Sequence, residues 1–228
     1  MKKETKAARV GAILKELYPD AVCSLEYDGE PWKLLVCARL SAQCTDERVN
    51  IVSGPLFEAF PTVQAMADAP VEAIESYIRS CGLYHGKAKS IKEACTQIVE
   101  DFGGKVPDTM EELLSLSGVG RKIANLLLGD VFGKGGIVAD THCIRITNRL
   151  GLCEKADPVH VERTLDPIVP KNEQSDLCHR LVHFGRDVCC AASPKCGECP
   201  MKAAKLCDFS PDGAKKAAKK SRSQNINN

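Results

Sequence analysis

Long apolar runs are missing from this chain of 228 residues. No apolar stretch approaches the roughly 18 residues that a membrane-spanning helix requires. The first 20 residues mix acidic and basic side chains, and their apolar residues fall at helical spacing. They therefore predict an amphipathic helix and not a secretion signal. These absences predict a cytoplasmic protein that has no membrane partner.

A large net charge is also missing, since the formal charge at pH 7 is only +1. Residues 213–228 nevertheless hold five basic residues and no acid, which leaves a net charge of −4 on the rest of the chain. Polar and basic composition predicts a disordered tail at 212–228. This tail either adds weak, salt-sensitive affinity for DNA or serves solubility alone. A body of negative net charge that binds DNA must gather its cations on one face.

Alternation of apolar and polar residues, the pattern of β-strands, is absent as well, and no repeat of fixed period is present. Helical periodicity is found instead along almost the whole chain, which predicts an all-α fold. Pro31 is expected to begin a helix, Thr45 and Asp108 to cap two others, and Pro61 to end one. The expected helices are 5–18, 31–43, 45–60, 71–80, 85–102, 109–116, 121–132, 141–150, 158–168 and 174–188.

A glycine hairpin stands out within this helical pattern, in the run LSGVGRKIA at residues 116–124. Gly118 and Gly120 permit positive φ and a close approach of the backbone to a ligand. The N–H groups at the start of the second helix would point outward with the positive end of its dipole, which suits a phosphate. A tight turn between two helices that binds nothing has the same pattern.

An amine and a carboxylate flank this hairpin. Lys122 lies just inside the second helix, and Asp140 stands at the expected start of the next one. An amine can attack carbon only while it is neutral, and a helix N-terminus favours the neutral form. The ordinary alternatives are that Lys122 is a solvated surface charge and that Asp140 is a helix cap. Capping and catalysis are compatible, because a capping aspartate is held rigidly and stays ionised.

Thirteen cysteines are many for a chain without an export signal, and their odd number argues against a disulfide framework. Eight are scattered among apolar residues, where free thiols behave as small hydrophobes. Four of the others, Cys189, Cys196, Cys199 and Cys207, predict a metal centre, with Cys190 as a rival for the first position. The spacing alone fits a [4Fe–4S] cluster and a tetrahedral zinc ion equally.

Taken together, these motifs resemble the endonuclease III family of DNA glycosylases/AP lyases. The matching stretches are LLVCARLSAQCTDERVN, GLYHGKAKSI, LSGVGRKIANLLLGDVFG, VADTHCIRITNRLGL and HFGRDVCCAASPKCGECPMKAAKLC, and the resemblance covers about residues 5–210. It implies a two-lobed, helix–hairpin–helix glycosylase fold. A helical barrel would span 25–134, a cluster domain would join 1–24 to 135–211, and the tail would follow at 212–228.

The resemblance also assigns roles to single residues. Lys122 would attack C1′ of the sugar and form a Schiff base, with help from Asp140, and β-elimination would then cut the strand 3′ to the lesion. The damaged base must first leave the stack. Gln43 would fill the space it vacates, and Leu83 would wedge into the opposite strand. Asp46 and His142 would line the pocket, although either residue is equally typical of an ordinary helix.

The family further implies that the four cysteines hold a [4Fe–4S] cluster that is structural and senses DNA. Its partner would be double-stranded DNA with damaged bases or abasic sites, bound by a monomer at the bacterial nucleoid. Three departures are present: Ser117 replaces the family's usual proline before GVG, the last cysteine gap is seven residues long, and Cys190 duplicates the first ligand.

Two rival functions remain open on the sequence. One is a monofunctional glycosylase for mismatched or alkylated bases, which Lys122 disfavours because the related adenine-mismatch glycosylases lack an amine at this position. The other is a DNA-binding protein without catalytic activity that uses its metal centre as a redox or structural element.

Overall fold

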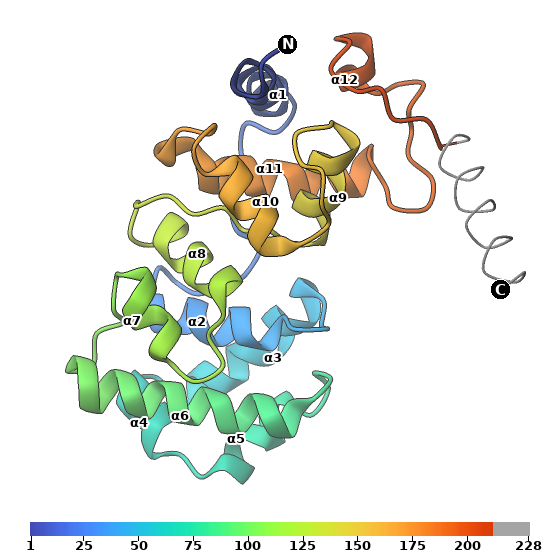
Figure 1. The fold of residues 1–228 in the computed structure, drawn as a ribbon. Coiled ribbons are helices and arrows are strands. Elements are labelled where there is room, and N and C mark those ends of the chain that lie inside the picture. The colour runs from blue at the N-terminus through green and yellow to red at the C-terminus, as the bar shows by residue number, and fades with distance from the viewer. Residues whose placement is uncertain (212–228) are drawn as a thin grey trace, which may run out of the picture. The chain divides into compact units, whose positions relative to one another are not determined.

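The computed structural model describes residues 1–211, so the predicted tail at 212–228 lies outside the described residues. This range contains helices and no strand. It divides into two compact units, which Figure 1 shows as a ribbon. One unit is Cys23–Gly136, and the other joins Met1–Val22 to the chain from Ile137 onward. The first helix is therefore packed with the last third of the sequence.

The unit Cys23–Gly136 is built around one central helix. Its helices are α2 (Pro31–Leu40), α3 (Asp46–Ala59), α4 (Val63–Asp68), α5 (Val71–Ile78), α6 (Tyr84–Phe102), α7 (Met110–Ser115) and α8 (Arg121–Asp130). α2 contacts α3, α6 and α8. Leu34, Val36 and Cys37 of this helix are fully buried. A helix that is apolar on most of its faces is stable only when others cover it, which puts α2 at the centre.

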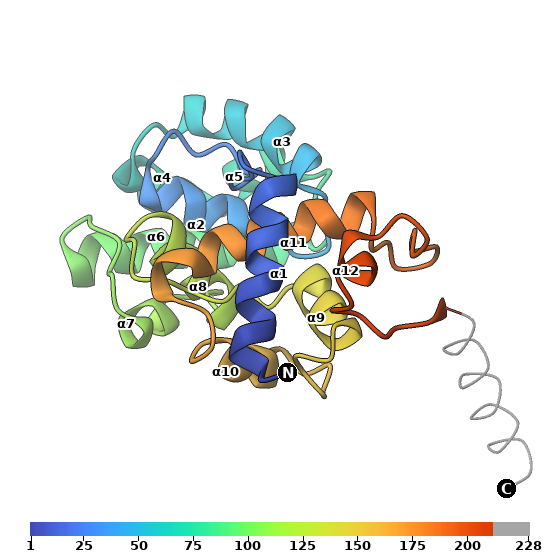
Figure 2. The same cartoon turned by 90° about the horizontal axis from the view of Figure 1, so that it is seen from above.

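The other unit consists of α1 (Lys3–Leu17), α9 (Thr141–Arg149), α10 (Pro158–Leu165), the short 3₁₀ helix η1 (Lys171–Glu173), α11 (Gln174–Asp187) and α12 (Pro200–Ala203). α1 and α9 both pack against α11, and Figure 2 shows α1 running across α11. Leu14 and Phe184 are buried in this core. Within residues 1–211, no helix is both long enough and apolar enough to cross a membrane.

Most of the expected helices are present, and the differences lie at their ends and in short segments. α2 ends at Leu40 and not at residue 43, because Gln43 adopts a left-handed conformation with φ of 56°. Thr45 caps α3 as predicted, by accepting from Arg48 N–H. The prediction for Asp108 was wrong: Thr109 caps α7, and Asp108 instead pairs with Lys134.

Two short helices were not predicted from the sequence pattern. α4 has only 6 residues and α12 only 4. Thr62 accepts from Ala65 N–H and so caps α4, a signal that the sequence did contain. α12 begins at Pro200, directly after Cys199, in a segment whose side chains suggested metal ligation more than helix formation.

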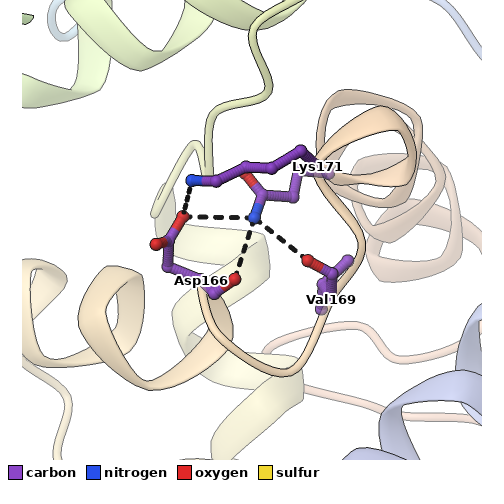
Figure 3. Close-up of polar contacts among 4 residues, drawn as sticks. Asp166, Val169 and Lys171 are labelled. Atoms are coloured by element: carbon purple, nitrogen blue, oxygen red, sulfur yellow. Dashed lines mark hydrogen bonds and ion pairs between the residues drawn. The ribbon is translucent and has the colours of Figure 1, made fainter.

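A buried amide ties together the loop between α10 and α11. The Nε2 atom of Gln174 donates to the carbonyls of Asp166 and Val169, each at 3.1 Å, and also to a carboxylate oxygen of Asp166. Lys171 pairs with the same carboxylate, as Figure 3 shows. Its ammonium is the first cause that lowers the pKa of Asp166. This loop is thereby fixed against the start of α11.

Candidate active site and cysteine segment

The glycine hairpin joins α7 to α8, and these two helices pack against each other (Figure 1). Gly118 has φ of 73°, the left-handed region that glycine favours. A Cβ atom at this position would lie 2.6 Å from Arg39 Nε and 2.9 Å from Ser90 Cβ. Gly118 therefore seats the hairpin directly on α2 and α6, and any side chain would force it off them.

Gly120 plays a different part from the one predicted, because its φ is −103° and its backbone is extended. It is the N-cap of α8, and it brings no side chain to bond the first N–H groups. A Cβ here would meet nothing within 4 Å, so the surface in front of the helix is open. The positive end of the helix dipole is thus accessible to an anion.

Lys122 is the second residue of α8, and its side chain is exposed. One turn further along, Asn125 is buried, and its Nδ2 atom has no hydrogen-bond partner. Its backbone carbonyl packs so closely on Gly136 that a Cβ there would lie 2.2 Å from this oxygen. α8 is therefore anchored through its buried face, while its first turn presents the amine of Lys122 outward.

Ser117, the departure from the family's proline, has a definite structural role. Its N–H donates to Gln97 Oε1 at 2.7 Å, and its hydroxyl donates to Glu93 at 2.7 Å. Gln97 also donates to the carbonyl of Ser115 at 3.2 Å. A proline has no N–H and could not make the first bond. The entry to the hairpin is thus tied to α6 by side chains and not by a rigid ring.

Asp140 is the N-cap of α9, as the sequence predicted. Its carboxylate accepts from Cys143 N–H at 2.7 Å, which fixes the side chain at the start of the helix. Asp140 and His142 belong to the unit that joins Met1–Val22 to the chain from Ile137 onward, whereas Lys122 belongs to Cys23–Gly136. The two residues that the sequence assigned to one reaction thus come from different units.

His142 is held by Arg145, a residue that the sequence analysis did not single out. The guanidinium NH2 lies 3.2 Å from His142 Nδ1 and also donates to the carbonyls of Gly185 and Cys189 at 3.1 Å each. A guanidinium only donates, so Nδ1 of His142 would be the acceptor in this contact. A Cβ on Gly185 would lie 2.3 Å from Nδ1, which requires glycine there.

Gln43 and Leu83 lie in adjacent turns of the unit Cys23–Gly136. A Cβ atom on Gly82 would be 3.8 Å from the carbonyl oxygen of Gln43. Both residues have left-handed backbones, with φ of 56° and 60°, which is uncommon for residues other than glycine. Leu83 is 67% exposed. Asp46, three residues after Gln43, is the first residue of α3 and accepts a hydrogen bond from the Ser24 hydroxyl at 2.7 Å.

The cysteine segment is organised around Arg149. Its guanidinium donates to the thiol of Cys189 at 3.3 Å and to the carbonyls of Cys190 and Ala191 at 2.8 and 2.9 Å. Cys207 donates to the carbonyl of Arg149 at 3.4 Å. Because Arg145 and Arg149 lie one helical turn apart, the spacing could have revealed them as a pair, but arginines at helical spacing are common on solvated faces.

A match to a family model covers residues 36–171, and its description is "HhH-GPD superfamily base excision DNA repair protein". This range includes the hairpin, Lys122 and Asp140. The chain belongs to this family. Within it, the sequence is 46% identical to endonuclease III of Synechocystis over 206 residues, which is 90% of this chain and 93% of the relative. Endonuclease III of Escherichia coli is 36% identical over 90% of this chain and 96% of its own.

Solved structures of family members agree with the fold. The structure described as a non-covalent endonuclease III–DNA complex has a TM-score of 0.85 and 39% identity, over 96% of this chain and all of that one. A trapped endonuclease III–DNA covalent intermediate has a TM-score of 0.84 and 40% identity, over 91% and 97% of the two chains. The all-helical fold with a helix–hairpin–helix motif is thereby confirmed, as is membership of the endonuclease III family.

Family membership suggests an iron–sulfur group, and the cysteine segment supplies four thiols, the ligand type that such a group requires. The thiols of Cys189 and Cys207 both interact electrostatically with that of Cys199, and burial raises the pKa of the first two. Within residues 1–211, no three potential ligands converge closely enough to hold a single metal ion. A four-iron cluster requires less convergence than one zinc ion, because each cysteine binds a different iron. Cys190 donates its thiol to the carbonyl of Arg186 at 3.0 Å.

Proposed function

We propose that Lys122 and Asp140 carry the chemistry of a bifunctional DNA glycosylase/AP lyase. By its family the protein is a base-excision-repair glycosylase that removes oxidised pyrimidines and cuts the strand 3′ to the abasic site. The observation that carries the residue assignment is the exposed amine of Lys122 in the first turn of α8, beside an uncovered helix N-terminus. The N–H groups at such a terminus can bind a backbone phosphate.

The chemistry follows from the two side chains. The neutral amine of Lys122 attacks C1′, the bond from C1′ to the base breaks, and the departing base takes a proton that the amine loses. The bond from C1′ to the ring oxygen then breaks, this oxygen takes a proton from water, and the nitrogen lone pair forms the protonated Schiff base. A proton is then removed from C2′ and the C3′–O bond breaks, which cuts the strand. Asp140, fixed by its bond to Cys143 N–H, supplies negative charge that stabilises the cationic sugar or assists proton transfer.

Borohydride trapping tests this proposal on a duplex that contains an oxidised pyrimidine. We expect a covalent adduct with the wild type and with Lys89→Gln, an exposed lysine of α6, but none with Lys122→Gln. An adduct that persists in Lys122→Gln would refute the assignment. Base release without any adduct would instead indicate a monofunctional glycosylase, and binding without release would indicate a non-catalytic DNA-binding protein.

We further propose that Cys189, Cys196, Cys199 and Cys207 hold a [4Fe–4S] cluster, which supplies a structural cross-link within the C-terminal segment. Cys189 is favoured over Cys190 because its thiol interacts with Cys199 and with the Arg149 guanidinium, whereas that of Cys190 bonds to a backbone carbonyl. We expect Cys189→Ser to lose the broad visible absorption and the iron, and Cys190→Ser to retain both. A colourless protein that contains zinc would overturn the cluster.

The partner in this proposal is double-stranded DNA with damaged bases or abasic sites, bound by Gln43, Leu83, Gly118, Gly120 and His142, with Asp46 lining the substrate pocket. We propose that the protein acts as a monomer on nucleoid DNA in the cytoplasm. The unit Cys23–Gly136 contains both left-handed turns and the hairpin with its exposed helix start, which supports a DNA-binding face on this unit. His142 would contribute from the other unit.

A further inference from the structure

Lys87 is a buried lysine to which neither the sequence motifs nor the proposed chemistry assigns a role. It lies in the first turn of α6 and is only 1% exposed. Desolvation is the first cause that lowers its pKa. Burial of an ammonium group is costly unless the group is bonded, so its position requires a specific partner.

That partner is the end of α2. Lys87 Nζ donates to the carbonyl of Leu40 at 2.7 Å, the last residue of the helix. The C-terminal carbonyls of a helix carry the negative end of its dipole, which stabilises a cation there. Gln43 lies three residues after Leu40 and has a positive φ. Its turn therefore follows directly on the Leu40 carbonyl that Lys87 bonds.

The backbone of Lys87 bonds the turn that contains Leu83. Lys87 N–H donates to the carbonyl of Leu83 at 3.1 Å and so closes the first turn of α6. Leu83 is the N-cap of this helix, in a left-handed conformation and without a side-chain cap bond. A non-glycine residue in this region is strained and persists only when its surroundings fix it.

Two thiols connect the same turns beside the ammonium group. Cys44 follows Gln43, and Cys81 precedes Leu83 by two residues. The pKa of Cys81 is raised to about 11, first by burial and then by a hydrogen bond with the thiol of Cys44, while Lys87 opposes this shift. The turns thus lie close together at Gly82 and Gln43 and interact through these two thiols.

We propose that Lys87 is a positioning residue for base excision in duplex DNA, which holds the turns of Gln43 and Leu83 as one rigid body through its ammonium and its backbone N–H. The inference rests on the proposed entry of these two side chains into the helix. It assigns Lys87 no contact with DNA. Misplacement of a reacting group by about 1 Å costs roughly a hundredfold in rate, so small shifts of these turns affect base extrusion.

Lys92 provides a matched control on the same helix. Its ammonium donates to the carbonyls of Ala67 and Ala69 at 2.7 and 2.8 Å, at the end of α4. Lys87→Met removes the one hydrogen bond of its ammonium to the end of α2, and Lys92→Met removes the two hydrogen bonds of its ammonium at the end of α4. Loss of stability alone would affect both variants, whereas loss of the two DNA-facing turns would affect only Lys87→Met.

The experiment compares two reactions of the full-length enzyme under single-turnover conditions. One is excision of an oxidised pyrimidine from a duplex, and the other is strand cutting of a single-stranded oligonucleotide with a preformed abasic site, where no base has to be extruded. We expect Lys87→Met to slow excision by about tenfold to a hundredfold and to leave cutting within about twofold. Lys92→Met should change neither rate beyond about twofold.

A fluorescent adenine analogue placed opposite the lesion gives a readout independent of turnover. Bound by Lys122→Gln, the analogue should brighten as the stack opens, and adding Lys87→Met to this variant should abolish the change while binding persists. The proposal would be overturned if Lys87→Met slowed excision and strand cutting equally, or slowed neither. It would also be overturned if Lys92→Met slowed excision selectively to the same extent as Lys87→Met. If Leu83→Ala and Gln43→Ala excise the base at the normal rate, the proposed roles of those two residues are wrong. The inference about Lys87 is then wrong as well, but this result is distinguishable from a failure of Lys87→Met alone.

Discussion

Asp140 has a structural role as a helix cap and a proposed chemical role, and substitution can separate the two. Its oxygen accepts from Cys143 N–H at 2.7 Å at the start of α9. Asparagine caps helices about as well as aspartate does but carries no charge. Asp157, which accepts from His160 N–H at 2.7 Å, makes the same cap on α10 and has no proposed part in the reaction.

We expect Asp140→Asn to slow base excision by about a hundredfold or more, because a charge that stabilises the transition state is lost. Its melting temperature should stay close to that of the wild type, because the cap is retained. Asp157→Asn should preserve both activity and melting temperature. Equal activity of the two variants in a single-turnover excision assay would show that Asp140 is only a cap.

At the scale of single residues, the sequence predicted a structural role correctly where the residue type fits only a few roles. The cap at Asp140 and the left-handed Gly118 follow from local backbone chemistry, which a single sequence reveals. The bond from Ser117 to Gln97 joins residues 20 positions apart, and the contact between the turns of Gln43 and Gly82 joins residues even further apart. Such contacts depend on tertiary packing, so no local pattern could predict them.

At the scale of elements, the hairpin depends on its attachment to α6. Gln97 accepts from Ser117 N–H and donates to the carbonyl of Ser115, so it bonds the chain on both sides of Leu116. The helices themselves were largely predictable, because apolar periodicity and caps are local. The short α4 and α12 were not predicted, and α12, with four residues, is barely longer than one turn and shows no period.

We expect Gln97→Ala to weaken duplex DNA binding by up to roughly thirtyfold, as the loss of two hydrogen bonds of about 1 kcal/mol each implies. Ser117→Ala keeps the backbone N–H and removes only the bond to Glu93, so its effect should be smaller. Fluorescence anisotropy with an uncleavable abasic analogue measures both. The slope of affinity against salt should not change, because the phosphate contacts are the same in number; a shallower slope would contradict this explanation.

At the scale of the whole molecule, buried thiols couple folding to alkaline pH. Burial raises the pKa of Cys37 and Cys95 from 9.0 to about 12, and neither residue is exposed. Below pH 9 both thiols are protonated in the folded and the unfolded chain. Between pH 9 and 12 only the unfolded chain releases these protons, so its relative free energy falls as pH rises.

Each such thiol should therefore lower the free energy of unfolding by about 1.4 kcal/mol per pH unit in this window. Melting temperatures followed by circular dichroism at pH 8 and pH 10 test the expectation. Cys95→Ala should be less stable than the wild type at pH 8 because it leaves a small cavity, yet it should lose less stability on going to pH 10. Parallel losses in the two proteins would show that other groups govern the alkaline transition.

The placement of α1 has a consequence for how the protein is made. Lys3 pairs with Glu154, Tyr18 accepts from Arg180, and Arg9 donates to the carbonyl of Ala204. During synthesis the unit Cys23–Gly136 can fold as soon as it leaves the ribosome, since domains generally fold as units. The first helix, although made earliest, must wait for nearly the last residues. The nascent chain thus completes the unit that contains Lys122 well before the unit that contains Asp140. The two proposed catalytic residues are therefore both in folded units only near the end of translation.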